Sequence, residues 1–431
     1  MKDKVSITAG GGFVAAKFTL IKIAYRNIWR NMRRTVLCIV AVGIAVFFAI
    51  FMQSMMDGMV QSIEDVVQVF DTGHVSVVSA EYEAEKEYFP VQYPVANGRS
   101  AEELASLIET SVPGVKAAMP RITAYATLQD STVKHALLWG LDIEKELTVN
   151  TFNLSKRSSG LVEGRFPNAE GNECIIGAGM AKKAGLKIGD RIPLKTVSAQ
   201  FSDKIWSPVI VGLFNFDYRK YDEEAILVSF ERLQRLLVLG EGSQQLFVYA
   251  DDERQSGAIA AELRAMLGKN DVIREWRDNY FVAIMQQSMI LYVIIYLVFQ
   301  IVASFLIVNT VVMVIHERIK EIGMMGSLGM TRREIVAVFF FEAIFLSIIG
   351  SLAGCVAGGV STLIGSFFPF DFNAMTGGGL KDYPMTGTIF LVFSPAVILQ
   401  GFLFGVIIAS ICTLIPSLKS AFVEPVEALR N

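Results

Sequence analysis

Histidine and cysteine are scarce in this sequence, which has three histidines and four cysteines in 431 residues. His74, His135 and His316 are far apart along the chain. A metal site or a Ser/His/Asp triad needs such side chains to gather in one place, and their order indicates no such cluster. Cys174 is the only cysteine outside the long hydrophobic runs, so that part of the chain forms no internal disulfide. We therefore expect no metal site and no catalytic residues.

A nucleotide-binding loop is also missing. A P-loop requires the pattern Gly-x4-Gly-Lys-Ser/Thr, which occurs nowhere in the chain. The sequence has no strongly basic domain and no nucleic-acid-binding motif, so nucleic acid is not an expected partner. We expect a chain that is not an enzyme, does not hydrolyse ATP itself and carries no cofactor.

Long apolar runs dominate what is present. Hydrophobic residues make up 52% of the chain and charged residues 19%, with a mean hydropathy of +0.45. About 20 consecutive apolar residues suffice to span a bilayer as a helix. Four such runs occur, at 36–56, 284–315, 335–366 and 389–415. The sequence predicts an α-helical membrane protein with four transmembrane helices.

A long polar segment, 57–283, is inserted between the first two runs. It contains 24 Lys and Arg against 33 Asp and Glu, a net charge of −9, whereas residues 1–35 contain 8 against 1, a net of +7. Basic residues beside membrane spans mark the cytoplasmic face. We therefore expect a cytoplasmic N-terminus and an extracytoplasmic segment 57–283. The loop at 367–388 then lies outside, and residues 416–431 return to the cytoplasm.

The inserted segment reads as an α+β domain. Strands are expected at 73–78, 115–128, 133–141, 173–176, 191–196, 206–214, 225–229, 245–250 and 271–275. Helices are expected near 101–111, where Ser100 and Glu103 form a capping box, and near 178–184 and 253–268. This order suggests two subdomains, with the stretch of about 130–215 inserted into the other.

Residues 18–34 combine an apolar helical face with many basic residues. Ile21, Tyr25, Ile28 and Met32 share one face of a helix, and Trp29 lies among them. Such a segment is typical of an interfacial helix on the inner leaflet. The alternative is a simple basic flank of the first span.

The loop 316–334 is an ordered block of charge and glycine between two spans. Charged residues stand at both ends, and Ile322 to Met330 between them is apolar and interrupted by glycines. Thr331 and Glu334 form a capping box, so the third helix should begin near Arg332. The loop is therefore a short amphipathic element presented to a partner in the cytoplasm.

Inside the spans, one charged residue and several glycines are notable. Glu342 lies about 15 Å along the third helix at the standard helical rise, and it either has a functional role or packs as a buried, hydrogen-bonded side chain. Small residues four apart let membrane helices approach closely. These are Gly350, Gly354 and Gly358 in the third span, with Gly401 and Gly405 in the fourth.

Methionine and aromatic residues cluster at the outer ends of the first two spans. Methionine suits surfaces that accept varied apolar ligands. We expect a lipid- or substrate-accepting cavity there, with ordinary core packing as the alternative. Its candidate residues are Phe48, Met52, Met55, Met56, Met285, Met289 and Tyr292.

Several motifs together resemble permeases of the MacB/FtsX-type ABC transporter superfamily. They extend over nearly the whole chain from residue 18. The matching segments are YRNIWRN…RRT at 25–35, GRFP at 164–167, GLKIGD at 185–190, ERIKEIG at 317–323, LG at 328–329, RREI at 332–335 and EPVEALR at 424–430.

The resemblance implies a bacterial inner-membrane permease subunit driven by a separate ABC ATPase dimer, which binds the ATP and Mg²⁺. It also implies a second permease copy or paralogue, and it makes the cytoplasmic loop a coupling helix that docks on the ATPase. The coupling residues would be Glu317, Arg318, Glu321, Ile322, Gly323, Leu328, Gly329, Arg332 and Arg333.

Within this superfamily the layout is most like lipoprotein-release permeases of the LolC/LolE kind. MacB-type efflux pumps carry an ATPase fused ahead of the first span, and about 35 residues precede it here. We expect extraction of lipoproteins from the inner membrane, with a periplasmic chaperone as outer partner. The alternatives are MacB-like efflux or lipid export with a periplasmic adaptor, and FtsX-like signalling to extracytoplasmic hydrolases.

Overall fold

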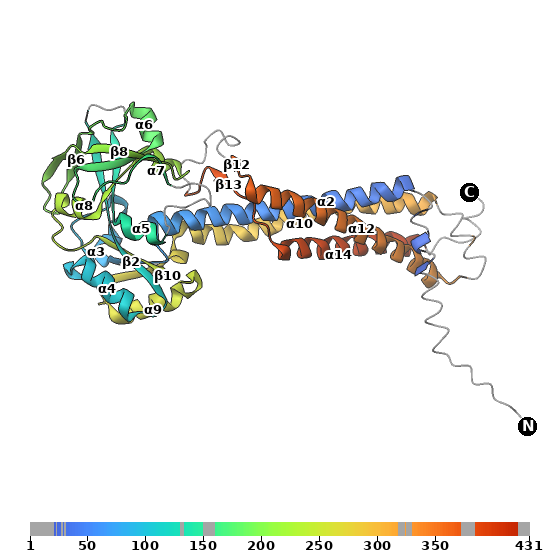
Figure 1. The fold of residues 1–431 in the computed structure, drawn as a ribbon. Helices are drawn as coiled ribbons and strands as arrows, with labels where there is room; N and C mark the ends of the chain where they lie inside the picture. Colours follow the sequence, from blue (N-terminus) through green and yellow to red (C-terminus); the bar gives the residue numbers. More distant parts are fainter. Residues whose placement is uncertain are drawn as a thin grey trace, which may run out of the picture. The chain divides into compact units, whose positions relative to one another are not determined.

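The computed structural model describes residues 21–22, 24–26, 29, 32–129, 133–149, 160–317, 324, 330–371 and 384–420. The chain divides into two compact units. The helical unit comprises residues 1–58, 288–369 and 390–431, and the sheet unit comprises residues 59–287 and 370–389. Figure 1 shows long helices in the first unit and a large mixed sheet with short helices in the second.

Four long helices supply the helical unit, and two of them continue into the sheet unit. They are α2 (Met32–Val67), α10 (Tyr280–Glu317), α12 (Arg332–Phe367) and α14 (Pro395–Ser420). Helices α2, α10 and α12 contain no proline, so none of them has the break in backbone hydrogen bonding that a proline inside a helix causes. Proline at the first position of α14 fits a helix start, where its missing N–H has no partner to lose.

Two of the four expected spans are long apolar helices of sufficient length to cross a membrane among the residues described. These are Thr35–Thr72 and Arg332–Phe367. The other two expected spans fall on α10 and α14, in which Tyr280–Ile295 and Pro395–Ile411 are apolar among the described residues. The last helix begins at Pro395 instead of residue 389, because Thr388 and Ile389 form strand β13, which pairs with β12 (Phe370–Asp371).

The sheet unit alternates strands with short helices. Its strands are β1 (Val75–Ser79), β2 (Val115–Leu128), β3 (His135–Leu141), β4 (Leu161–Gly164), β5 (Glu173–Gly177), β6 (Leu194–Val197), β7 (Asp203–Trp206), β8 (Val209–Phe214), β9 (Ala225–Ser229), β10 (Gln245–Ala250) and β11 (Asp271–Glu275). Its helices after α2 are η1 (Gln68–Thr72), α3 (Ala80–Ala84), η2 (Lys86–Tyr88), η3 (Val95–Gly98), α4 (Ala101–Ser111), α5 (Ile143–Val149), α6 (Ala178–Ala184), α7 (Arg219–Glu224), α8 (Phe230–Leu237), η4 (Glu253–Gln255), α9 (Ser256–Met266) and η5 (Trp276–Asp278).

One eleven-stranded sheet runs through this unit in the order β11-β1-β10-β2-β3-β9-β5-β8-β4, with β6 and β7 attached along β2. Pairing is parallel between β3 and β9 and between β5 and β8, and antiparallel between the other neighbours. The long strand β2 therefore joins two sets of strands, one on β10 and one on β3.

The two sets of strands have separate hydrophobic cores. In what we call the α4–α9 half, β1, β10, β11 and the start of β2 pack against α4 and α9. In the α6–α8 half, the end of β2 with β3, β5, β6, β8 and β9 packs against α6 and α8. Ala118 belongs to the first core and Ile122 to the second, so the division falls inside β2. Figure 1 shows these halves as two lobes. Apart from Val91 and Ala101, the residues of the second core lie between Ile122 and Leu239.

Most expected strands occur, and the differences have local causes. The strand expected at 206–214 occurs as β8 from Val209 onward, and Trp206 instead ends β7. Pro208 between them has no backbone N–H to donate to a ladder. Helix α4 begins after Ser100 as expected, but the Ser100 side chain makes no capping hydrogen bond, so that capping box is wrong. Helices α3, α5, α7 and α8, of five to eight residues, were not expected, whereas α6, of seven residues, was.

Candidate functional site

The glycines of α12 face α2 at very short range. A Cβ atom placed on Gly350 would lie 2.8 Å from the Cβ of Val42, and one on Gly354 would lie 2.5 Å from the carbonyl oxygen of Gly43. On Gly358 the nearest atom would be the Cβ of Ile50, at 3.1 Å. Real Cβ atoms essentially never come within 3.0 Å of such atoms. Because these three glycines have no side chain, α12 can lie this close to α2.

The glycines of α14 approach the same residues of α2. A Cβ on Gly401 would lie 2.8 Å from Ile50 Cγ1, and one on Gly405 would lie 2.5 Å from Val46 Cγ2. Val42, Val46 and Ile50 form a buried cluster with Cys355 of α12, and Ile398 and Phe402 of α14 pack against it. The two predicted glycine ladders thus meet on one face of α2.

Glu342 lies on the buried face of α12, with 7% of its surface exposed. Val338 and Phe339 on the same helix are also buried, as is the adjacent Ala343. The carboxyl group therefore faces protein.

Of the predicted coupling loop, the structure describes the two ends, 316–317 and 330–334, and Met324 between them. Glu317 is the last residue of α10, and the exposed Arg332 and Arg333 begin α12. The Thr331–Glu334 capping box is present: the Glu334 N–H donates to Thr331 Oγ1 over 3.4 Å, and the Thr331 N–H donates to Glu334 Oε2 over 2.8 Å. The helix start predicted near Arg332 is confirmed. Arg318, Glu321, Ile322, Gly323, Leu328 and Gly329 lie outside the described residues.

The residues of the predicted lipid cavity fall in different environments. Phe48 and Met52 are exposed, with 55% and 40% of their surface accessible. Met55, Met56 and Tyr292 are half-buried, and the side chain of Met289 lies outside the described part of the chain. Met285 packs in the sheet unit against a cluster that includes Ile63, Trp276 and Met385. The structure thus assigns Met285 to a packed core.

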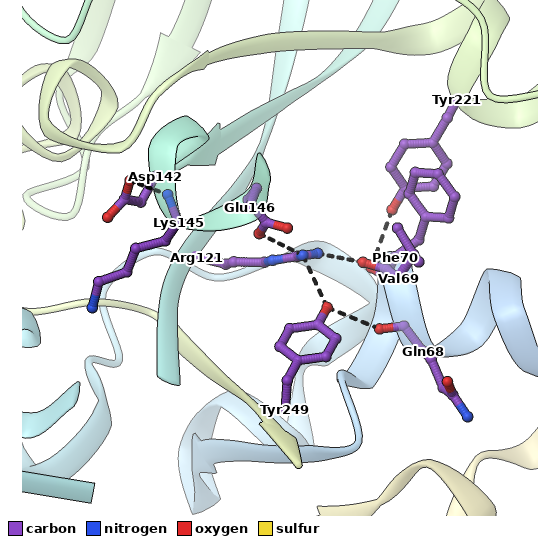
Figure 2. Close-up of polar contacts among 9 residues, drawn as sticks. All are labelled: Gln68, Val69, Phe70, Arg121, Asp142, Lys145, Glu146, Tyr221 and Tyr249. Atoms are coloured by element: carbon purple, nitrogen blue, oxygen red, sulfur yellow. Dashed lines mark hydrogen bonds and ion pairs between the residues drawn. The ribbon is translucent and has the colours of Figure 1, made fainter. Parts of the chain in front are cut away.

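A buried polar site that the sequence analysis missed closes the outer end of α2. After Val67 the helix continues as the π-helical turn η1, which ends before Gly73. The last carbonyl groups of a helix generally lack partners within it. Three side chains of the sheet unit donate to carbonyl groups of this turn (Figure 2). Arg121 of β2 donates to the carbonyl oxygen of Val69, Tyr249 of β10 donates to that of Gln68 over 3.1 Å, and Tyr221 of α7 donates to that of Phe70 over 3.4 Å.

Arg121 is the centre of this site, which we call the α2 cap. Its side chain is fully buried, and it donates to Glu146 Oε1 of α5 over 2.6 Å and to the Tyr249 hydroxyl over 3.1 Å. Its guanidinium also lies over the rings of Trp139 and Phe247, at 5.0 and 4.5 Å from their centres. The positive charge of Arg121 interacts favourably with the negative end of the helix dipole at the C-terminus of α2. Because this charge is buried, it also requires an opposite charge nearby, which Glu146 supplies.

Burial also sets the protonation of the tyrosines in the α2 cap. Loss of hydration raises the pKa of Tyr221 and that of Tyr249 well above the ordinary value of 10, so both hydroxyl groups keep their protons and act as donors. One signal in the sequence could have revealed the site. Arg121 is the only charged residue between Ala117 and Leu128, in a strand that is otherwise mostly apolar.

A short segment between α12 and α14 is bound to the sheet unit as well. Thr386 and Ser62 of α2 share a hydrogen bond of 2.7 Å between their hydroxyl groups. The N–H of Thr388 donates to Asp217 Oδ2 over 2.8 Å, and that of Gly387 donates to the Asp217 carbonyl over 2.6 Å. The outer part of α2 is thus held at both Ser62 and the α2 cap.

Comparison with known protein families covers both units. The FtsX-like permease C-terminal family matches residues 293–425, and the MacB-like periplasmic core domain family matches residues 35–266, more than half of the chain. The chain belongs to the FtsX/MacB family of ABC transporter permeases. It is thus a non-catalytic membrane subunit with a periplasmic-type outer domain, and membership in this family implies a partner ATPase.

Individual relatives differ in how much of this FtsX/MacB permease they match. The lipoprotein-releasing system transmembrane protein LolC of Xylella fastidiosa is 23% identical over 339 residues, which cover 74% of this chain and 78% of LolC. The macrolide export ATP-binding/permease protein MacB of Agrobacterium fabrum is 29% identical over 124 residues, or 28% of this chain and 16% of MacB. Among solved structures, the periplasmic region of MacB from Actinobacillus actinomycetemcomitans aligns with 52% of this chain at 10% identity and a TM-score of 0.34.

Proposed function

We propose that this permease is a membrane subunit of a lipoprotein-release system in the bacterial inner membrane. The observation that carries the proposal is the extent of the match with LolC, which covers 74% of the chain and 78% of LolC. The match with the macrolide exporter covers 124 residues. A shared layout over most of both chains favours lipoprotein release over MacB-like efflux with an adaptor.

In this proposal all four long helices cross the membrane, and both termini lie in the cytoplasm. An ABC ATPase dimer binds ATP and Mg²⁺ and docks on the loop between α10 and α12, where the coupling residues would be those predicted from Glu317 to Arg333. A second permease copy or paralogue completes the complex. The confirmed capping box at Thr331 supports a defined end for this loop, because it fixes where α12 begins.

We propose that the outer partner is a soluble carrier of lipoproteins that docks on the hairpin β6–β7. Phe201 at the turn is 77% exposed, and Ile205 and Val197 are 71% and 48% exposed. Phe201 also has a left-handed backbone, with φ +55°, which is a strained conformation for an aromatic residue. An apolar group at the tip of a hairpin suits a partner that itself handles acyl chains.

The test is purification of the permease complex from native membranes, followed by mass spectrometry of bound protein and lipid. A triacylated lipoprotein together with a stand-alone ATPase would support the proposal. Reconstitution in liposomes would then show ATP-dependent release of that lipoprotein, with an ATPase variant unable to hydrolyse ATP as control. Recovery of a periplasmic adaptor and small apolar molecules would favour efflux, and recovery of a peptidoglycan hydrolase would favour signalling.

The docking hairpin is tested in the same reconstituted system. Phe201→Ser together with Ile205→Ser should lower transfer to the carrier at least tenfold while ATP hydrolysis is unchanged. The control is Lys204→Ser on the same hairpin. Equal transfer by the double variant would show that the carrier docks elsewhere.

A further inference from the structure

Strand β2 changes partners at Arg121. Residues from Val115 to Arg121 pair with β10, and residues from Arg121 to Thr127 pair with β3 on the opposite edge. Arg121 is the one residue of β2 that belongs to both registers, opposite Gln245 on one side and Leu141 on the other. The α4–α9 half and the α6–α8 half therefore meet at this residue.

The strand pairing around this point is weak. Pro120 precedes Arg121 and has no N–H for the ladder. Beyond Arg121 the edge that faced β10 has no strand partner among the described residues until Ala126, where β6 begins to pair. In that gap the N–H of Thr123 donates to the side chain of Gln244 over 2.7 Å. A ladder interrupted in this way bends more easily than a continuous one.

The end of α2 contacts both halves at this same place. Tyr249 of the α4–α9 half binds the carbonyl group of Gln68. Arg121, at the border of that half, binds the carbonyl group of Val69. The ring of Phe70 instead enters an aromatic pocket of the α6–α8 half, with ring centres 5.2 Å from Trp139, 5.3 Å from Phe216 and 4.2 Å from Tyr221.

Helix α5 links the same two halves. It follows β3 of the α6–α8 half, and its first turn is capped by Asp142, which accepts from the N–H of Lys145 over 3.1 Å. Glu146 binds Arg121, and the Lys145 ammonium lies 3.3 Å from Glu109 of α4 (Figure 2 shows Glu146, Asp142 and Lys145). The point where β2 changes partners and the attachment of α2 thus share one set of residues.

From this coincidence we propose that Arg121 is the pivot of the outer domain, and that a displacement of α2 changes the angle between its two halves. Arg121 is a positioning residue here, since it acts through the carbonyl groups of η1 and through Glu146. Its Nε atom is buried and has no hydrogen-bond partner among the described residues, so one donor is available when the carbonyl groups move. This inference rests on one part of the proposed function, which is that a partner ATPase moves α2.

The experiment measures the distance between spin labels on the two halves by pulsed electron paramagnetic resonance. The labels are placed at the exposed positions Glu103 of α4 and Lys182 of α6. The full complex with its ATPase, in nanodiscs, is compared without nucleotide and after trapping with ATP and vanadate. The wild-type protein should show a shift of the distance distribution between the two states.

Arg121→Met keeps the length of the side chain and removes the guanidinium, and it should abolish at least half of that shift. Tyr249→Phe removes one hydroxyl at nearly constant volume and should reduce the shift even if Arg121→Met does not fold. Arg165→Met, which breaks the exposed pair of Arg165 with Glu173, is the control and should keep the full shift. ATP hydrolysis should stay within about twofold of wild type in all of them.

A wild-type protein without any shift would overturn the inference, and so would a full shift in both Arg121→Met and Tyr249→Phe. The distance measurement involves no lipoprotein. If the shift is present and depends on Arg121 while no lipoprotein is released, the proposed function fails and the pivot stands.

Discussion

Replacement of Gly354 by alanine should push α12 away from α2. The new Cβ would lie 2.5 Å from the Gly43 carbonyl oxygen and 2.8 Å from the Val46 Cβ. The Gly43 oxygen is a backbone atom and the Val46 Cβ is bonded directly to the backbone, so no change of rotamer relieves the overlap. To reach ordinary contact at about 3.4 Å the helices must separate by roughly 0.6–0.9 Å locally, and overpacking of this kind costs about 1–3 kcal/mol.

Alanine also favours the helix itself by up to about 1 kcal/mol relative to glycine. The same benefit applies at Gly359, where a new Cβ would meet only the end of the flexible Ile398 side chain, at 3.2 Å. Gly359→Ala is therefore the matched control on the same helix. We expect Gly354→Ala to unfold at a lower temperature than wild type, and Gly359→Ala to unfold at the same or a higher one.

The assay is thermal unfolding of the full-length protein in detergent, followed by fluorescence-detected size-exclusion chromatography. Because the two variants share the same chemical change, their difference isolates the packing against α2. Equal melting temperatures for Gly354→Ala and Gly359→Ala would refute the assignment of Gly354 to a close helix contact.

Three further predictions concern stability. Burial raises the pKa of Asp222 to about 7 from an ordinary 3.8, so the folded state binds a proton that the unfolded chain has lost. Folding stability should therefore decrease as the pH rises from about 4 to 7, on the order of a few kcal/mol, and Asp222→Asn should remove most of this dependence in chemical denaturation at several pH values. Glu146→Ala leaves Arg121 buried without its counter-charge and should cost about 3–5 kcal/mol, whereas Glu146→Gln should cost clearly less, as measured by the same denaturation. Thr331→Ala removes the N-cap of α12 and should cost about 1 kcal/mol, with faster amide exchange confined to the first turn of that helix; unchanged exchange there would contradict the capping role.

The lengths of the hydrophobic runs and a capping signal predicted the long helices of this protein. The apolar runs indicated all four long helices, and the Thr331–Glu334 pair indicated the start of α12, because these signals are local in sequence. The sequence could not indicate that α14 begins at Pro395, since Thr388 and Ile389 are apolar enough for a span but pair with β12. That pairing depends on a contact between distant residues.

The α2 cap escaped prediction for the same reason. Arg121 and Glu146 are 25 positions apart and Arg121 and Tyr249 are 128 apart, so their pairing depends on the order of strands in the sheet. Met285 was a candidate residue of the expected cavity, with ordinary core packing as the alternative. The structure packs it against a core that includes Met385, 100 positions later, so it favours the packing alternative at this residue. Composition indicated an apolar environment but could not distinguish a lined space from a filled one.

The π-helical turn at the end of α2 has a consequence for engineering this permease. A π turn holds more residues per turn than an α-helix, so deletion of one residue from Gln68–Thr72 would restore α geometry and rotate everything after it. The carbonyl groups that Arg121 and Tyr249 bind, and the ring of Phe70, would then face other directions. Chimaeric permeases that exchange outer domains should therefore carry this turn together with the sheet that binds it, with the junction placed before Val67.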